Sequence, residues 1–292
     1  MGHAVWYPGP RVGYVALRAA GPGAGATLPP VDTDDVLRLI QEVAAEVVTP
    51  RFGHLTDDEV GEKGPGDLVT AADREAEARI GEALRRAYPS ALVLGEEAVA
   101  DDAGLLDAFR TADHAFTLDP VDGTRNFVHG SPDHAVMVAE LRAGEVVRSW
   151  IWQPQHEAAY VAERGAGAWR DGERLQRPPV AADLHGVTGR RSWVGRALGT
   201  LRALELTWVC CGVDYPKLVE GAADYAVFGS TKPWDHAPGS LLLTEAGGAV
   251  GHFDGTAYRP QQDPPFGLVA AADAEVLALV RGLAGALPLP RR

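Results

Sequence analysis

The segment at positions 118–130 reads LDPVDGTRNFVHG and places two aspartates three residues apart, followed by a glycine and a threonine. The proline after Asp119 fixes the local backbone and so sets the angle between this acid and Asp122. Gly123 permits a sharp turn and a close approach of its amide to a ligand. Thr124 begins a short predicted helix whose first amides point at an anion. The spacing therefore predicts that both acids bind cations while the turn behind them receives phosphate.

Three further acidic segments stand at predicted element boundaries: DLVTAAD at 67–73, GEE at 95–97, and WDHAPGS at 234–240, the last ahead of TEAGG at 244–248. Each has a structural alternative. Thr70 with Asp73 also fits a capping box at a helix start. Glu96 follows a predicted strand, where exposed acids are common, and Asp235 also fits a helix N-cap. On local pattern alone both interpretations stay open.

Acids gathered at one point need a cation. Two carboxylates about 4 Å apart repel by roughly 4 kcal/mol at an effective dielectric near 20, so three or four would not be gathered for stability. Their hard oxygen ligands suit Mg²⁺, with Mn²⁺ possible, and the sequence has no Cys or His cluster that indicates zinc. We expect a pair of such ions, which also make the site attractive to phosphate.

The net charge of the whole chain limits the kinds of partner that it is expected to bind. Its 27 basic and 40 acidic residues give a net charge of −13. Nucleic acid and anionic membranes favour a basic surface, so neither is an expected partner. Such a chain also repels phosphate unless something local inverts the field. Its 46% hydrophobic and 23% charged residues are typical of a soluble globular protein.

The two cysteines, Cys210 and Cys211, are adjacent in the sequence. Neighbouring cysteines rarely bridge each other, and no metal-type cysteine spacing is present. A reduced, cytoplasmic setting is therefore predicted. No apolar run approaches membrane-spanning length, and the N-terminus lacks the pattern of a signal peptide.

The first half of the chain alternates helical and strand-like patterns. Residues 1–30, rich in Gly, Pro and Ala, are predicted to form a flexible extension. Apolar periodicity predicts helices at 33–52 and 70–87. Short apolar runs at 91–94 and 115–118 predict buried strands, and each leads directly into acids.

Hairpin-like signals at 134–170 predict a large antiparallel sheet. Further on, the pattern predicts strands at 206–209 and 224–228 and helices at 236–246 and 273–283. The chain is therefore expected to be a mixed α/β protein with an α+β layered arrangement.

No linker is evident inside residues 31–292, which are expected to form one domain. Its N-terminal half, about 31–185, carries the main acidic motifs, and its C-terminal half, about 186–292, carries Asp235.

The motifs taken together resemble the inositol monophosphatase family. They are Gly95-Glu-Glu, Asp-Pro-Val-Asp-Gly-Thr at 119–124, and Trp-Asp at 234–235 with Glu-Ala-Gly-Gly at 245–248. The resemblance covers about residues 33–285. It implies an αβαβα five-layer sandwich, a Mg²⁺-dependent and lithium-sensitive phosphomonoesterase activity, and a homodimer.

The resemblance also implies roles for individual residues. Glu96, Asp119 and the carbonyl of Val121 would hold one metal, with Asp119 bridging to the second and Glu96 reaching toward a third, so that two or three ions are implied. Asp122 and Asp235 would hold the second. The remaining roles are phosphate binding by the amides of Gly123 and Thr124, orientation and deprotonation of the attacking water by Thr124 with Asp73, and a flexible-loop lysine at Lys63. The mechanism implied is in-line attack on phosphorus by a metal-activated water.

The residues that would choose the substrate depart from the family pattern. Phe228 stands where inositol-specific members carry an acid, which weakens myo-inositol phosphate as the preferred substrate. Lys232 would meet an extra anionic group, with a solvated surface lysine as the alternative. Asp214 would take over hydroxyl recognition, or serve only as a helix N-terminal acid. His236 is either a support for Asp235 or a helix-surface histidine.

The expected activity is hydrolysis of a small phosphorylated metabolite, such as an inositol-1-phosphate-like polyol phosphate. Histidinol phosphate, a nucleotide 3′-phosphate and fructose 1,6-bisphosphate are alternative substrates on the same scaffold. A non-catalytic metal-binding relative is the alternative from another class. Because all four acids Glu96, Asp119, Asp122 and Asp235 are present, the sequence favours an enzyme.

Overall fold

The first helical layer consists of α1 (Thr33–Val43) and α2 (Ala71–Ala87). The computed structural model describes residues 32–64, 66–180, 182–262, 267–285 and 287, so the predicted extension at 1–30 lies outside the described residues. After α1 the chain continues through a π-helical turn and a 3₁₀ turn as far as Arg51. The helices predicted at 33–52 and 70–87 are both confirmed.

A seven-stranded sheet lies against these helices, in the order β3-β4-β5-β6-β7-β8-β9. The strands are β3 (Leu92–Gly95), β4 (His114–Asp122), β5 (Ala135–Arg142), β6 (Glu145–Gln153), β7 (Ala158–Glu163), β8 (Gly167–Arg170) and β9 (Glu173–Leu175). Only the β3–β4 pair is parallel, and all others are antiparallel. The predicted antiparallel sheet is confirmed.

Both faces of this sheet are apolar, because successive residues of a strand point to opposite sides. On β5, Val136 and Val138 pack with α1 and α2. Met137 and Ala139 join a second cluster on the other face, with residues of the helices α6 (Cys211–Val219) and α7 (Pro233–Glu245). A sheet buried on both faces must lie between two layers, which is what the alternation produces.

A five-stranded sheet follows, in the order β11-β10-β12-β14-β13. Its strands are β10 (Gly186–Thr188), β11 (Glu205–Leu206), β12 (Tyr225–Phe228), β13 (Ala249–His252) and β14 (Leu268–Ala271). On β12, Ala226 packs toward the α6–α7 layer, whereas Val227 packs toward α8 (Ala274–Ala284). The last helix was predicted correctly. The strand predicted at 206–209 was largely wrong, because β11 ends at Leu206.

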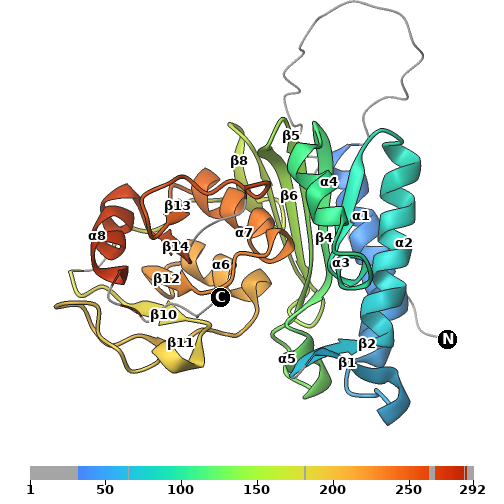
Figure 1. Ribbon diagram of the computed structural model, residues 1–292, viewed down its shortest axis with the longest axis horizontal. Coiled ribbons are helices and arrows are strands. Elements are labelled where there is room, and N and C mark those ends of the chain that lie inside the picture. The colour runs from blue at the N-terminus through green and yellow to red at the C-terminus, as the bar shows by residue number, and fades with distance from the viewer. Residues whose placement is uncertain (1–31, 65, 181, 263–266, 286, 288–292) are drawn as a thin grey trace, which may run out of the picture.

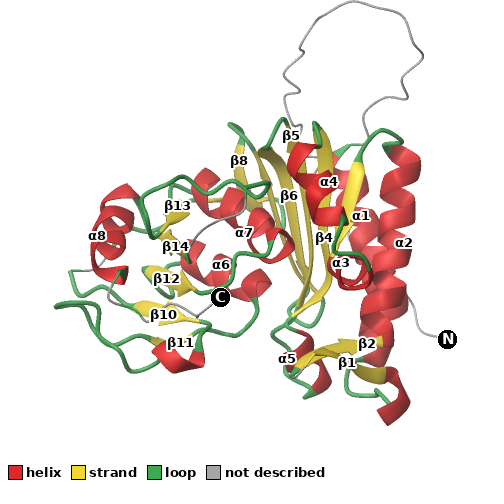
Figure 2. Ribbon diagram, viewed as in Figure 1, coloured by secondary structure: helices red, strands yellow, loops and turns green. Residues whose placement is uncertain are grey.

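The elements stack as helices, sheet, helices, sheet and helix across the long axis of the molecule (Figure 1). Figure 2 shows α6 and α7 between the two sheets and α8 on the outer face of the second sheet. The predicted α+β layered fold is confirmed. The two sheets fall on either side of position 185, and one apolar cluster joins them through α6 and α7.

A short hairpin and three short helices surround the acidic motifs. A hairpin of β1 (Val60–Gly64) and β2 (Asp67–Thr70) was not predicted, and it carries Lys63. The helices α3 (Glu96–Asp101) and α4 (Leu105–Thr111) follow β3, and α5 (Thr124–Val128) follows β4. Among the described residues, no helix is long and apolar enough to cross a membrane.

Candidate active site

Strand β4 carries both aspartates of the opening motif. Asp119 pairs with Met137 and Asp122 pairs with Ala135, and the register shifts between them. Proline has no N–H to donate to the ladder, so the irregularity falls at Pro120. The strand therefore runs through the acids instead of ending before them, which differs from the strand predicted at 115–118.

Gly123 makes the turn from β4 into α5. Its φ of 80° lies in the left-handed region, which favours glycine. A Cβ at this position would lie 3.0 Å from both the Asp133 carbonyl oxygen and the Cys210 Cβ. Thr124 then begins α5, as predicted. Any other residue at position 123 would strain the backbone and press against two neighbours.

Three of the predicted metal ligands converge from three separate elements. Glu96 begins α3, Asp119 lies on β4, and Asp235 lies in the first turn of α7. One carboxylate oxygen of each lies within 4.8 Å of the others. The N-cap reading of Asp235 is wrong, because α7 starts at Pro233 and its N-cap is Lys232.

Little positive charge within the protein balances the negative charge of Asp119, Asp122 and Asp235. Burial, together with the carboxylates of Glu96, Asp122 and Asp235, raises the pKa of Asp119 well above its usual range. Burial likewise raises the pKa of Asp235, and Glu96 adds to the effect. Burial also raises the pKa of Asp122 to about 6. Each of these acids is held in a place where its charged form is unfavourable, as expected where a cation completes the site.

Glu96 differs from its neighbours because two lysines reach it. Lys63 Nζ lies 3.0 Å and Lys232 Nζ 3.2 Å from the same atom, Glu96 Oε1. Lys63 also donates to Glu97 Oε1 at 2.8 Å. Although burial opposes ionisation of Glu96, Lys232 and Lys63 lower its pKa. The structure thus brings both predicted lysines to the acidic cluster, although Lys232 remains 42% exposed.

Asp73 and Thr124 lie together, as the resemblance implied. Thr124 Oγ1 is 3.2 Å from Asp73 Oδ1 and 3.0 Å from the Val121 carbonyl oxygen, and it can donate its proton to either. Asp73 Oδ2 also accepts the backbone N–H of Thr70 at 2.8 Å, and the Thr70 side chain caps α2 in return. The capping box and the contact with Thr124 therefore coexist, one on each oxygen of Asp73.

The start of α6, with the loop before it, holds Asp122. Its Oδ2 accepts the Gly212 N–H at 2.5 Å and lies 3.1 Å from the Cys210 sulfur. Both cysteines are free thiols. Asp214 is buried and accepts the Trp208 N–H at 3.0 Å. Its carboxylate thus serves the fold of the loop, and we do not assign it to hydroxyl recognition.

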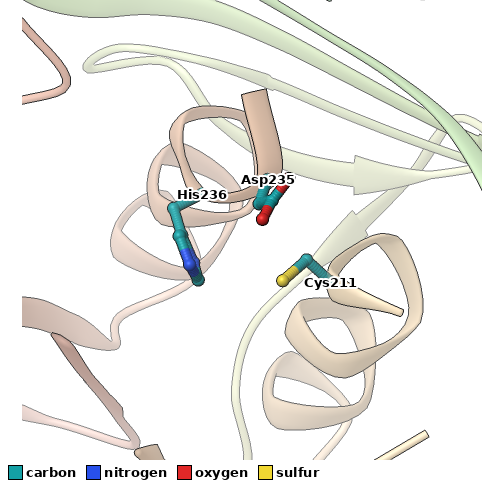
Figure 3. Close-up of side chains that lie close together, drawn as sticks. All are labelled: Cys211, Asp235 and His236. Atoms are coloured by element: carbon teal, nitrogen blue, oxygen red, sulfur yellow. The ribbon is translucent and has the colours of Figure 1, made fainter. Parts of the chain in front are cut away.

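Cys211, Asp235 and His236 form a second group of possible ligands, with one atom of each within 4.8 Å of the others (Figure 3). The sequence analysis found no Cys or His grouping, because these residues come from two helices that only the fold brings together. His236 is buried, so its reading as a surface histidine is wrong. Its Nδ1 lies 3.1 Å from the Tyr215 hydroxyl, and it hydrogen-bonds the Ser230 backbone. Because His236 is already engaged, we interpret it as a support for the turn that carries Asp235.

Glu77 of α2 is a site residue that the sequence analysis missed. Its two carboxylate oxygens accept the N–H groups of Glu97 and Ala98, each at 2.8 Å, and so cap α3. A Cβ on Gly95 would lie 2.2 Å from the Glu77 carboxyl carbon. Gly95 and Glu77 therefore set the position of Glu96 as a pair. Only the glycine of the Gly-Glu-Glu motif hinted at this close approach.

The residues fit a hard divalent cation. The carboxylate oxygens of Glu96, Asp119 and Asp235 converge, and Asp119 is 1% exposed with four acids acting on it. All-oxygen sites of this kind suit Mg²⁺ or Mn²⁺. Glu96, Asp119, the Val121 carbonyl, Asp122 and Asp235 are the groups that would hold such ions.

Comparison with known proteins agrees with this geometry. The family model described as "Inositol monophosphatase family" matches residues 32–284. The chain belongs to the inositol monophosphatase family. It is therefore a phosphoric monoester hydrolase of a metal-dependent family.

Two curated relatives are each 34% identical to this phosphatase. "Nus factor SuhB" of Pseudomonas aeruginosa aligns over 73% of this chain and 82% of its own length. "Inositol-1-monophosphatase" of Rhizobium meliloti aligns over 68% and 76%. "Fructose-1,6-bisphosphatase/inositol-1-monophosphatase" of Thermotoga maritima is 31% identical over 70% and 82%.

Solved structures share the fold. An IMPase structure from Thermotoga maritima matches with a TM-score of 0.72 and 26% identity, covering 86% of this phosphatase and 97% of that chain. An IMPase/NADP phosphatase structure matches with a TM-score of 0.74 and 20% identity, covering 89% of this phosphatase and 97% of that chain. At this identity the match supports the fold alone. The predicted family and fold are confirmed. The substrate, the number of ions and the lithium sensitivity stay predictions.

Proposed function

We propose that this phosphatase releases inorganic phosphate from a small phosphorylated metabolite, with Mg²⁺ held by Glu96, Asp119, Asp122 and Asp235. The observation that carries the proposal is the convergence of Glu96, Asp119 and Asp235 from three elements at one buried point. When bound there, Mg²⁺ neutralises the phosphoryl oxygens and makes the attacking water more acidic. The same ions overcome the repulsion that a chain of net charge −13 exerts on phosphate.

The phosphoryl group lies, in this proposal, against the turn at Gly123 and Thr124. Gly123 keeps that turn open because it has no side chain. The water oxygen bonds to phosphorus as the bond from phosphorus to the leaving oxygen breaks, in line with the attack. One water proton passes to the Thr124–Asp73 pair, and the leaving oxygen takes up a proton to become the alcohol.

Asp73 is suited to receive that proton. Burial, partly offset by the hydrogen bonds from Thr70, raises the pKa of Asp73 to about 7 in the metal-free protein. A general base works best when its pKa lies near the working pH. Thr124 lies between Asp73 and the turn, 3.2 Å from Asp73 Oδ1, and would relay the proton.

A panel of phosphate monoesters assayed with Mg²⁺ tests the proposal. Inositol 1-phosphate, histidinol phosphate, a nucleotide 3′-phosphate and fructose 1,6-bisphosphate cover the expected substrate and its alternatives. We expect phosphate release from at least one, its loss in the Asp122→Asn variant, and competition of Li⁺ with Mg²⁺. Glu82→Gln, on the exposed surface of α2, is the control variant. No release from any ester with Mg²⁺ or Mn²⁺ would overturn the proposal.

A second role, outside catalysis, deserves a test because the curated relatives include proteins named "Nus factor SuhB". Binding of candidate partners by the Asp122→Asn variant, at wild-type affinity, would separate it from hydrolysis. The expectation of no nucleic-acid partner, the cytoplasmic location and the homodimer all stay predictions.

A further inference from the structure

A cavity of about 470 Å³ opens beside Glu96 and is bordered by three cations. Lys63 comes from the β1–β2 hairpin, Arg74 from α2, and Lys232 from the start of α7. Two further acids, Asp67 and Asp101, also border it. Its size is that of a small-molecule site, and it adjoins the predicted reaction centre through Glu96.

A second cavity, of about 330 Å³, continues from the first. The two share Lys232 and Trp234, and the second adds Arg110 and Thr231 to its walls. The Lys232 ammonium lies 5.6 Å from the centre of the Trp234 ring. Lys232 therefore stands where the two cavities meet, with its ammonium beside a rigid aromatic wall.

The contacts of Lys232 depend on whether Glu96 holds a metal ion. Lys63 and Lys232 both donate to Glu96 Oε1, and Lys63 has a second acceptor in Glu97. In the described part of the chain, the one side-chain hydrogen bond of Lys232 is to Glu96, while Asp235 and Asp67 also act on its charge from nearby. A divalent cation on Glu96 would compete with both ammonium groups. Lys63 would keep its hydrogen bond to Glu97, whereas Lys232 would lose its hydrogen bond.

We propose that the leaving group of the substrate carries a second anionic group, a carboxylate or a phosphate, which Lys232 binds at the junction of the two cavities. The inference rests on the proposed phosphatase function and specifies its substrate class. A hydrogen bond between two charged groups is stronger than one to a neutral hydroxyl, so a neutral polyol phosphate gains less from this lysine. Arg74 adds positive charge on the wall of the first cavity, whereas Arg110, on the wall of the second, is already paired with Asp107.

Two matched pairs of esters test the proposal and separate the two kinds of anion. Glycerol 1-phosphate and 3-phosphoglycerate differ by a carboxylate, and fructose 6-phosphate and fructose 1,6-bisphosphate differ by a phosphate. The readout is the ratio of kcat/KM for the anionic member to that for its partner. We expect a ratio above one in at least one pair, a roughly tenfold fall in that ratio in Lys232→Met, and partial recovery in Lys232→Arg.

Lys217→Met is the control, because Lys217 is a lysine of similar exposure that pairs with Glu220 on α6. It should leave the ratio unchanged. A wild-type ratio of one or less in both pairs, or an equal ratio in Lys232→Met, would overturn the inference. A fall in activity on all four esters alike would also overturn it, since that result would indicate a purely structural role.

A binding measurement without turnover separates this inference from the proposed function. Calorimetry in the presence of Mn²⁺ compares 3-phosphonopropionate with propylphosphonate, which lacks the carboxylate. We expect tighter binding of the first by the wild type and loss of this difference in Lys232→Met. Preferential binding without phosphate release from any ester would refute the proposed function alone. Phosphate release without any preference would refute the inference alone.

Discussion

Glu140 and Asp119 lie on neighbouring strands of one sheet, 2% and 1% exposed, yet their surroundings differ. Arg148 Nε and Arg142 Nε lie 2.5 and 2.9 Å from the Glu140 carboxylate, and His114 Nε2 lies 3.0 Å away. Although burial opposes its charge, these partners lower the pKa of Glu140 to about 2. Around Asp119, burial and other acids raise the pKa instead.

The difference separates a structural ion cluster from a reactive one. A buried carboxylate with its own cations is complete, and removing either side leaves an uncompensated charge. A buried carboxylate among acids is complete only when an external cation arrives. Thus arginines of the protein neutralise Glu140, whereas Asp119 requires a cation bound from solution.

The largest effect is expected for Asp119→Asn on turnover. Removing a ligand shared by the predicted ions should lower kcat/KM by about a thousandfold or more, equivalent to roughly 4 kcal/mol. Steady-state assays with the best ester of the panel measure it. Glu140→Gln, matched in chemistry and burial, should retain kcat/KM in the fraction that remains folded. Similar losses of kcat/KM in both variants would show that Asp119 and Glu140 do not differ in role.

Stability should respond in the opposite order. In protein freed of metal by a chelator, Glu140→Gln should lower the free energy of unfolding by about 3 kcal/mol, because the buried ion pair between Glu140 and Arg148 is broken. Asp119→Asn should raise it by roughly 1 kcal/mol or more, since the asparagine removes a carboxyl whose pKa is raised by the fold. Urea unfolding monitored by tryptophan fluorescence measures both. Destabilisation of the metal-free protein by Asp119→Asn would contradict the account.

Glu77→Gln tests whether Glu77 positions Glu96 for metal binding. The amide offers one acceptor oxygen where Glu77 offers two, so one of the Glu97 and Ala98 N–H groups loses its partner. Residues that orient metal ligands typically change affinity by 10- to 100-fold, and we expect about a tenfold loss of Mn²⁺ affinity. Calorimetric titration measures it, with Glu82→Gln on the same helix as the control. An unchanged affinity would mean that Glu77 acts only in folding.

The smallest effect concerns pH. The raised pKa values of Asp119, Asp122 and Asp235 mean that the metal-free fold binds more protons than the unfolded chain, so these groups destabilise it as pH rises. Metal binding must displace those protons. The increase in melting temperature caused by Mg²⁺ should therefore grow from pH 5.5 to pH 8. Burial lowers the pKa of His134 to about 4 and that of His236 to about 3, so both stay neutral over this range and cancel from the difference. An increase that shrinks with pH would refute the assignment.

Much of the site was predictable because its signals are local. The turn at Gly123, the start of α5 at Thr124 and the capping box of Thr70 with Asp73 each depend on residues within a few positions. The hairpin-like signals at 134–170 likewise predicted the antiparallel sheet, and the unbroken apolar run at the start of β5 explains why both faces of that sheet are covered.

The rest could not be predicted, because it depends on contacts between distant segments. Lys232 meets Glu96 across 136 positions, and Glu77 caps α3 across 20. The burial of Asp214 and His236 follows from the packing of α6 and α7, which no local pattern encodes. Even the hairpin that carries Lys63 escaped prediction, since its short strands lack a sustained alternation.

The central claim is that the acids around Asp119 bind divalent cations. Titration of Mn²⁺ into chelator-treated protein, followed by electron paramagnetic resonance at pH 7.5, is its most direct test. The account predicts saturable binding of at least two ions by the wild type and by Glu140→Gln, and the loss of at least one in Asp119→Asn. Equal binding by the wild type and Asp119→Asn, or none by the wild type, would contradict it.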